Sequence, residues 1–283
     1  MNVNFMTYMK SRQFSSNTME NYIRHINQFM NYIGKDETDI TPFDIMNWMG
    51  EIGQVNTASS VHTKLESVKS YFEFLYNFGF INSNPAEKIE SPKFYNKPKN
   101  YMNLNMIQDM VKACKSNRDK AIILTLAFTG MRVSELTALT IDNYMAMKQR
   151  GDNQILIVGK GAKKRYIVFN NQVQASIDYY IKTWTAPRNC DKLFLSMWGN
   201  EIARNNLNMT LKSIAKEAGI PFWEEISPHA LRSACASIYS EAGMPVANIR
   251  DMLGHSNIKT TSLYVKSSLQ NTTNVVMNMN ISI

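Results

Sequence analysis

Cysteine and histidine are scarce in this chain of 283 residues, which contains three cysteines and four histidines. The cysteines, Cys114, Cys190 and Cys235, lie far apart and form no C-x-x-C pair. This spacing offers neither a disulfide framework nor a zinc site. Because histidines are also few, the sequence shows no metal-binding cluster, and it predicts a protein that needs no metal or other cofactor.

Long apolar segments are missing as well. The longest runs from Ala121 to Phe128 and is interrupted by Thr125. It falls far short of the roughly 20 residues that span a bilayer. Residues 1–16 lack the apolar core of a signal peptide. The sequence therefore predicts a cytoplasmic protein with no membrane partner.

Basic residues outnumber acidic ones. Lysine and arginine total 31 against 23 aspartate and glutamate, which gives a formal net charge of +8. Such a surplus suits a polyanionic partner, either nucleic acid or an anionic membrane, and charge alone does not choose between them. The length is sufficient for two modest domains with cores of their own.

The first part of the chain has the pattern of a small helical domain over residues 1–82. Apolar residues recur at helical spacing. Asn17 followed by Glu20 resembles a capping box at the start of one helix. Thr41, directly before a proline, predicts the start of a second helix, and a third begins near Thr57.

The composition changes over residues 83–100, which contain three prolines and several lysines, including Lys93 and Lys97. Proline breaks helices, so this segment is predicted to be a linker. Its lysines suit contacts with the phosphates of a duplex, because such pairs need no fixed geometry. A plain solvated hinge explains the same composition equally well.

The second part, residues 101–283, is mostly helical in pattern, with one exception. Residues 154–158 and 165–169 are rich in isoleucine, valine and tyrosine and flank a basic segment that contains Lys160, Lys163 and Lys164. This pattern predicts a β-hairpin with a basic tip. The chain ends in an uncharged tail over residues 267–283.

Four motifs carry polar side chains suited to cleaving a phosphodiester without a metal. This chemistry needs a nucleophile, cations on the non-bridging oxygens, an acid and a base. In the first motif, TGMRVSEL, Arg132 begins a helix and can donate two hydrogen bonds to a phosphate, while Glu135 can hold it in place. In the second, Lys160 lies between two glycines and can approach a backbone closely, although a charged surface turn has the same composition.

The other two motifs supply histidines and a tyrosine. In SPHALR, Ser227 and the proline after it start a helix that carries His229 and Arg232 on one face. In LGHSNIKTTSLY, His255 follows a helix-ending glycine and Tyr264 comes nine residues later. Each motif alone is weak evidence for such a site, because a single histidine or tyrosine usually serves only in packing. The four motifs in this order are far more specific evidence for it.

With these motifs in order, the chain resembles the tyrosine recombinases of the Xer and phage-integrase family, from its helical N-terminal part through Tyr264. The resemblance implies a mainly α-helical fold with a small β-hairpin in the catalytic domain. It also implies a two-domain, C-shaped DNA clamp, in which a helical core-binding domain precedes the catalytic domain. One departure is Ser233, where family members often have a second histidine.

The resemblance also implies roles for the motif residues. Tyr264 would be the nucleophile that forms a 3′-phosphotyrosyl bond and frees a 5′-hydroxyl. Arg132 and Arg232 would neutralise the phosphorane, and Lys160 would protonate the leaving 5′ oxygen. Because the covalent link conserves the bond energy, this chemistry would need neither ATP nor a metal.

The remaining residues would support the reaction or bind the duplex. His229 would assist proton transfer at the tyrosine, His255 would hydrogen-bond a phosphate oxygen, and Glu135 would support Arg132. The cations predicted to bind DNA are Lys163, Lys164, Arg165, Lys93 and Lys97.

Partners and biological role follow from the same resemblance. It implies double-stranded DNA and a homotetramer on two sites, with a dimer on each site, and it leaves open an accessory DNA-bending or recombinase partner. No arm-binding domain is expected before the core-binding region, which begins almost at once. Two biological roles fit the resemblance: a resolvase of chromosome dimers, plasmids or transposon cointegrates, and a small mobile-element integrase. The protein would be encoded by a bacterium, phage or mobile element and would associate with the nucleoid.

Two rival functions use the same residues differently. A type IB topoisomerase-like enzyme would share the phosphotyrosine chemistry without exchanging partners. A DNA-binding architectural or regulatory protein on a recombinase scaffold would lack catalysis, but all six predicted catalytic residues are present.

Overall fold

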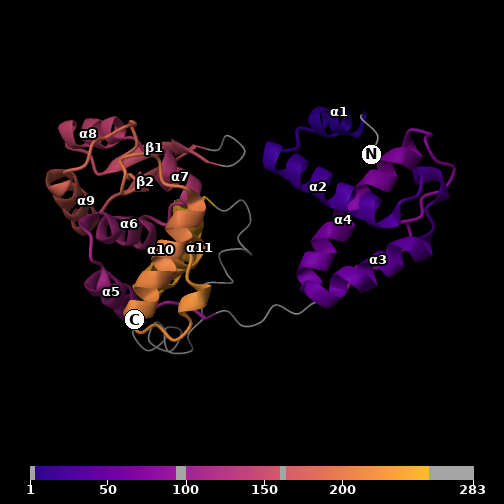
Figure 1. Cartoon of the computed structure of the whole chain (residues 1–283). Coiled ribbons are helices and arrows are strands. Elements are labelled where there is room, and N and C mark those ends of the chain that lie inside the picture. Colours follow the sequence, from indigo (N-terminus) through magenta and orange to yellow (C-terminus); the bar gives the residue numbers. More distant parts are fainter. Residues whose placement is uncertain (1–3, 94–99, 160–163, 255–283) are drawn as a thin grey trace, which may run out of the picture. The chain divides into compact units, whose positions relative to one another are not determined.

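The computed structural model describes residues 4–93, 100–159 and 164–254. The chain divides into two compact units, Met1–Pro98 and Lys99–Ile283, and each has its own hydrophobic core (Figure 1). Their described residues are mainly α-helical with one small antiparallel sheet, which confirms the predicted fold class. None of the helices in these ranges has the length and apolar character needed to cross a membrane.

The first unit is helical throughout its regular elements. These are α1 (Asn4–Ser11), α2 (Ser16–Ile33), the 3-10 helix η1 (Glu37–Asp39), α3 (Pro42–Val55) and α4 (Ala58–Asn77). Thr41 caps α3 in a capping box with Asp44, and Thr57 caps α4, so both predicted helix starts are confirmed. The predicted capping box at Asn17 is wrong: Ser15 accepts the N–H of Thr18, and α2 begins earlier.

Aromatic side chains fill the core of the first unit, where α2 packs against α3 and α4. Phe29 of α2 contacts the ring of Trp48 edge to face, with centroids 5.1 Å apart. Ala86 and Ile89 are buried in the same core, which therefore extends into the segment for which the sequence predicts a linker.

The second unit surrounds a buried helix, α6. Its helices are α5 (Leu104–Ala113), α6 (Asn117–Thr129), α7 (Val133–Ala138), α8 (Ile141–Gln149), α9 (Asn171–Thr183), α10 (Arg204–Glu217), the 3-10 helix η3 (Trp223–Glu225), α11 (Pro228–Glu241) and α12 (Val246–Leu253). Most of α6 is buried, and it packs against α5, α9 and α11. A helix that is mostly apolar and buried is held in place by the helices packed around it. This packing fixes the C-terminal end of α6, where the first motif begins.

The predicted hairpin is confirmed as strands β1 (Gln154–Val158) and β2 (Lys164–Val168), which pair antiparallel with Ile155 opposite Ile167. The second strand begins one residue earlier than predicted. Successive side chains of a strand point to opposite faces of the sheet. Ile155 and Ile167 are buried in the core, and Arg165 shares their face because it lies two residues before Ile167.

Candidate active site

Arg132 follows the end of the buried helix α6. Gly130 ends α6 in the left-handed conformation, at φ +61°, and Arg132 is the N-cap residue of α7. Leu253 and Cys235 lie so close to Gly130 that a β-carbon there would meet both side chains. The short turn thus places Arg132 against α11 and α12, although these helices come about a hundred residues later.

Glu135 holds Arg132 in this position. Its carboxylate accepts the backbone N–H of Arg132 at 2.7 Å and the Nη1 of the same residue at 3.0 Å. It also accepts two hydrogen bonds from Arg165, at 2.8 and 2.7 Å. With four donors on two oxygens and a side chain that is only 6% exposed, Glu135 is a buried and fully paired carboxylate.

Arg232 reaches the same place from α11. Ser227 caps this helix by accepting the N–H of Ala230, and Pro228 follows, so the predicted helix start is confirmed. Arg232 lies one turn later and is only 4% exposed. Its guanidinium donates to the carbonyl of Gly130 at 2.6 Å and to that of Leu253 at 2.5 Å.

The C-terminus of α12 is where three arginines meet. The last carbonyls of a helix have no partner within the helix and carry partial negative charge. Each of three consecutive carbonyls accepts a hydrogen bond from a different guanidinium. The pairs are Met252 with Arg165 at 3.1 Å, Leu253 with Arg232 at 2.5 Å, and Gly254 with Arg132 at 3.2 Å.

Among the described residues of this cluster, three arginines face one carboxylate, so positive charge exceeds negative charge. Burial, and then the charges of Arg132 and Arg165, lower the pKa of Arg232 to about 10. Burial raises the pKa of Glu135, but hydrogen bonds from Arg165 and Arg132 outweigh it, so the net pKa is lowered. An anion brought to the arginines would relieve their mutual repulsion, which makes the cluster suited to a phosphate.

His229 lies in the first turn of α11, three residues before Arg232, and its side chain is exposed. Helix N-termini favour anions, and histidine exchanges protons near neutral pH. The structure therefore places a histidine on the same helix as one of the clustered arginines, as predicted.

Five of the predicted site residues lie outside the described residues: Lys160, Lys163, Lys97, His255 and Tyr264. Gly254, whose carbonyl binds Arg132, is the residue directly before His255 in the sequence. Lys164 is exposed at the start of β2, and Lys93 is exposed in the first unit.

Arg165 occupies a different position from the one its predicted role requires. The sequence groups it with the DNA-binding cations of the hairpin, but its side chain is only 9% exposed. Its guanidinium makes a two-pronged ion pair with Glu135 and a further hydrogen bond to Met252. With these donors occupied inside the protein, Arg165 is part of the arginine cluster and not of an exposed basic tip.

The arrangement can neutralise the charge of a phosphate with arginine side chains. Two guanidiniums from separate segments converge, one held by a carboxylate and the other by backbone carbonyls. Within the described ranges, no group of three or more histidine, cysteine, aspartate or glutamate residues could hold a metal ion.

We expect Gly130→Ala to destabilise the second unit by about 2 to 4 kcal/mol, because the left-handed backbone and the contact with Leu253 both disfavour a β-carbon. Chemical denaturation monitored by circular dichroism measures the change. Gly151→Ala is the control, because Gly151 is also left-handed, at φ +69°, but its β-carbon would meet nothing within 4 Å. Equal destabilisation by the two substitutions would contradict the close packing at Gly130.

Sequence profiles of known families match both units. The profile of the phage integrase family matches residues 100–271, and that of the phage integrase N-terminal SAM-like domain matches residues 3–79. The chain is 33% identical to tyrosine recombinase XerD of Rickettsia bellii over 275 residues, which cover 90% of each protein. It is 30% identical to tyrosine recombinase XerD of Listeria monocytogenes over 89% of each protein.

Solved structures share the fold at low sequence identity. A crystal structure of a lambda integrase dimer bound to a COC′ core site matches with a TM-score of 0.75 and 17% identity over 94% of each chain. A post-cleavage complex of the XerH site-specific recombinase with a palindromic difH substrate matches with a TM-score of 0.73 and 18% identity, covering 95% of this chain and 82% of that one. The chain therefore belongs to the phage integrase family of tyrosine recombinases, enzymes that cleave and rejoin DNA at specific sites.

Proposed function

We propose that this protein recombines double-stranded DNA at a specific site, with the arginine cluster as the binding site of the scissile phosphate. The observation that supports this most strongly is the convergence of Arg132 and Arg232 on the end of α12, although they lie a hundred residues apart in the sequence. An enzyme that stabilises a pentacoordinate phosphorane needs fixed donors where negative charge develops.

In the proposed reaction the phenolic oxygen of Tyr264 attacks the phosphorus. A bond forms between this oxygen and the 3′ phosphate, the bond to the 5′ oxygen breaks, and Lys160 gives that oxygen a proton. Arg132 and Arg232 bind the non-bridging oxygens throughout. In the second step a 5′-hydroxyl of the other duplex attacks the phosphotyrosine and releases Tyr264.

Two histidines act on the proton of the tyrosine hydroxyl and on a non-bridging oxygen of the phosphate. His229, in the first turn of α11, accepts the proton of the tyrosine hydroxyl, and His255 donates a hydrogen bond to a non-bridging oxygen. Glu135 keeps Arg132 oriented for its contact. The family motif supports the role of His255. The motifs and the described geometry together support the roles of His229 and Glu135.

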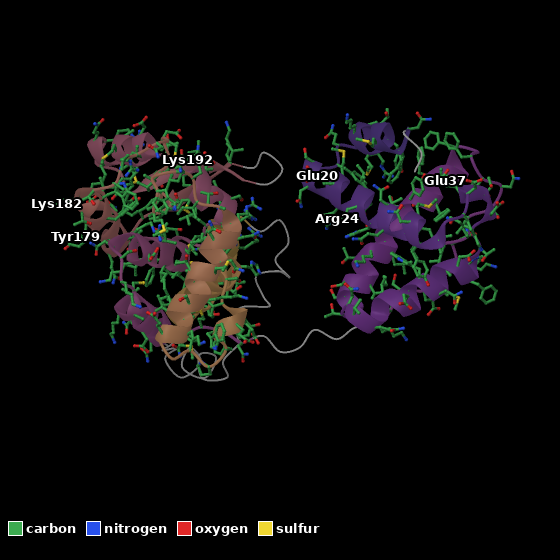
Figure 2. The ribbon with its side chains drawn as sticks, in the orientation of Figure 1. Glu20, Arg24, Glu37, Tyr179, Lys182 and Lys192 are labelled. Carbon is green, nitrogen blue, oxygen red and sulfur yellow. The ribbon has the colours of Figure 1, made fainter. Side chains whose placement is uncertain are left out.

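The first unit offers a polar groove for the duplex. A groove of about 450 Å³ between α2 and α4 is lined by Arg24 and Lys64, by the rings of Tyr22 and His25, and by small polar side chains. Arg24 is exposed on α2 (Figure 2) and donates to Asn21 at 2.7 Å, and Lys64 donates to Asn56 at 3.4 Å. Cations and amides of this kind bind phosphates and base edges.

For assembly we propose two protomers on each site and four in the complex that exchanges strands. A strand cleaved at one site can be joined to a strand of another site only when the two sites are held together. One protomer on one site cannot hold them together. The biological role is resolution of DNA multimers or integration of a mobile element, and both use the same strand exchange.

Strand exchange between two labelled duplexes that carry the same site from the protein's genomic flank tests this function. We expect recombinant products of predicted length without added metal or nucleotide. A plasmid that lacks the site should stay supercoiled. Relaxation of that plasmid without exchange would instead indicate a topoisomerase, and binding without any strand cleavage would indicate an architectural protein.

Removal of residues 267–283 is expected to impair synapsis of two sites more than binding to one site. This tail lies outside the described residues. It is uncharged and contains Leu269, Val275, Val276 and Met279, so we propose that it docks on a neighbouring protomer. Gel-shift titration measures single-site binding, and a two-site bridging assay measures synapsis. Equal loss in both assays would count against docking in trans.

A further inference from the structure

We propose that Arg165 is a positioning residue of the active site, which fixes Arg132 and the end of α12 relative to each other by binding Glu135 and the carbonyl of Met252. The inference rests on the proposed function, because it concerns the same phosphate site. It gives Arg165 a role in the reaction in place of the DNA contact that the sequence predicts.

The hydrogen bonds of Arg165 link three separate segments. From β2, its Nη1 and Nη2 donate to the two oxygens of Glu135 on α7, and its Nε donates to the carbonyl of Met252 on α12. A guanidinium holds its donors in a rigid plane, so occupying all three positions fixes the carboxylate relative to the helix end. The lysine ammonium, a single donor centre, has no equivalent geometry.

The contact continues into the backbone of the site. Gly254 ends α12 at φ +66°, and a β-carbon there would lie 3.0 Å from the Cδ of Arg165 and 3.2 Å from its Nη1. Arg165 thus packs directly against the residue whose carbonyl binds Arg132. Since Gly254 immediately precedes His255, the same contact fixes the point from which the chain continues toward His255 and Tyr264.

Arg165 also determines how well Glu135 can hold Arg132. Among the described residues, the charged groups that act on Glu135 are Arg132 at the start of α7, Arg165 on β2 and, through space, Arg232 on α11. Hydrogen bonds from Arg165 are the largest of the effects that lower the pKa of Glu135, and burial opposes them. Without Arg165, the pKa of this buried carboxyl would rise. The contact with Arg132 would then weaken as the pH falls, because a protonated carboxyl binds a guanidinium less strongly than a carboxylate does.

The test measures the rate of covalent adduct formation on a nicked suicide duplex, for full-length protein, from pH 6 to pH 8. We expect Arg165→Ala to lower the rate by about 10- to 100-fold, a loss typical of misplaced catalytic groups, while affinity for the duplex stays within about twofold. The loss should be greater at pH 6 than at pH 8. Dividing each variant rate by the wild-type rate at the same pH removes every pH effect that the variant shares with the wild type.

Three further variants separate positioning from general stability. Arg165→Lys keeps the charge but not the fork, so we expect an intermediate rate with an unfolding midpoint close to wild type. Adding Glu135→Gln to Arg165→Ala removes the titrating group and should abolish the extra loss at pH 6. The matched control is Arg150→Ala, because Arg150 forms an exposed ion pair with Asp152 in the same unit and should leave the rate unchanged.

Two results would overturn the inference. One is a wild-type rate in both Arg165 variants, and the other is a loss in Arg165→Ala that does not vary with pH and parallels its loss of folded protein. If Arg165→Ala does not fold, the rate of Arg165→Lys decides alone. Failure of the proposed function gives a different result, since wild-type protein would then form no adduct at all.

Discussion

Replacing Tyr264 with phenylalanine is expected to reduce covalent attachment to DNA by at least about 10⁴-fold, to below detection, because the substitution removes the only proposed nucleophile. The aromatic ring is retained, so packing and duplex affinity should change little. The measurement is the fraction of suicide duplex that becomes resistant to extraction from protein.

Tyr179→Phe is the matched control for this prediction. Tyr179 is an exposed tyrosine on α9 (Figure 2), and it has no place in the proposed mechanism. We expect it to form adduct at the wild-type rate. Adduct formation by Tyr264→Phe at a comparable rate would show that a different residue attacks the phosphate.

Replacing Arg132 with alanine is expected to slow cleavage by about 10²- to 10³-fold, the usual effect of removing one preorganised donor from a developing anion. Binding to the duplex should persist, because many other contacts contribute to it. Arg132 is the better of the two arginines for this test. Its side chain is 30% exposed, whereas Arg232 is buried and bridges two backbone carbonyls, so its removal would also destabilise the fold.

The control for Arg132→Ala is Arg250→Ala. Arg250 lies on α12 one turn before Gly254 and pairs with Asp251 at the surface, so its loss removes a nearby positive charge without altering the cluster. We expect wild-type cleavage from this variant. If both substitutions slow cleavage equally, Arg132 contributes only general positive charge and the proposed phosphate contact is wrong.

Local sequence signals predicted much of the fold. Thr41, Thr57 and Ser227 each cap the helix that their sequence context indicates, since capping depends on residues within one turn. The start of α2 was misplaced because Ser15 and Asn17 are both good caps and lie only two residues apart. Only packing of the whole helix decides between such neighbours.

The buried position of Arg165 is not predictable from the sequence of β2. Alternation in a strand would assign Arg165 to the buried face with Ile167, but the exposed residues Tyr166 and Val168 are also apolar. Each face also begins with one cation, Lys164 on the outer face and Arg165 on the inner face, so the sequence does not reveal which face is buried. The run of cations before Arg165 therefore suggested a surface role.

The arginine cluster could be predicted only in part. The motifs identified Arg132, Glu135 and Arg232 as members of one site. The carbonyls at the end of α12 carry no sequence signal, because every residue has one. That they bind three arginines depends on contacts among three separate stretches of the chain, which contain α6 with α7, β2, and α11 with α12.

The most direct test of the whole account is to identify the amino acid that becomes joined to DNA. Wild-type protein is trapped on a suicide duplex, the complex is digested with protease and nuclease, and the nucleotide-bearing peptide is sequenced by mass spectrometry. The account predicts one modified peptide, with a 3′-phosphonucleotide on the oxygen of Tyr264. A nucleotide on any other residue, or strand cleavage that leaves no protein attached, would contradict it.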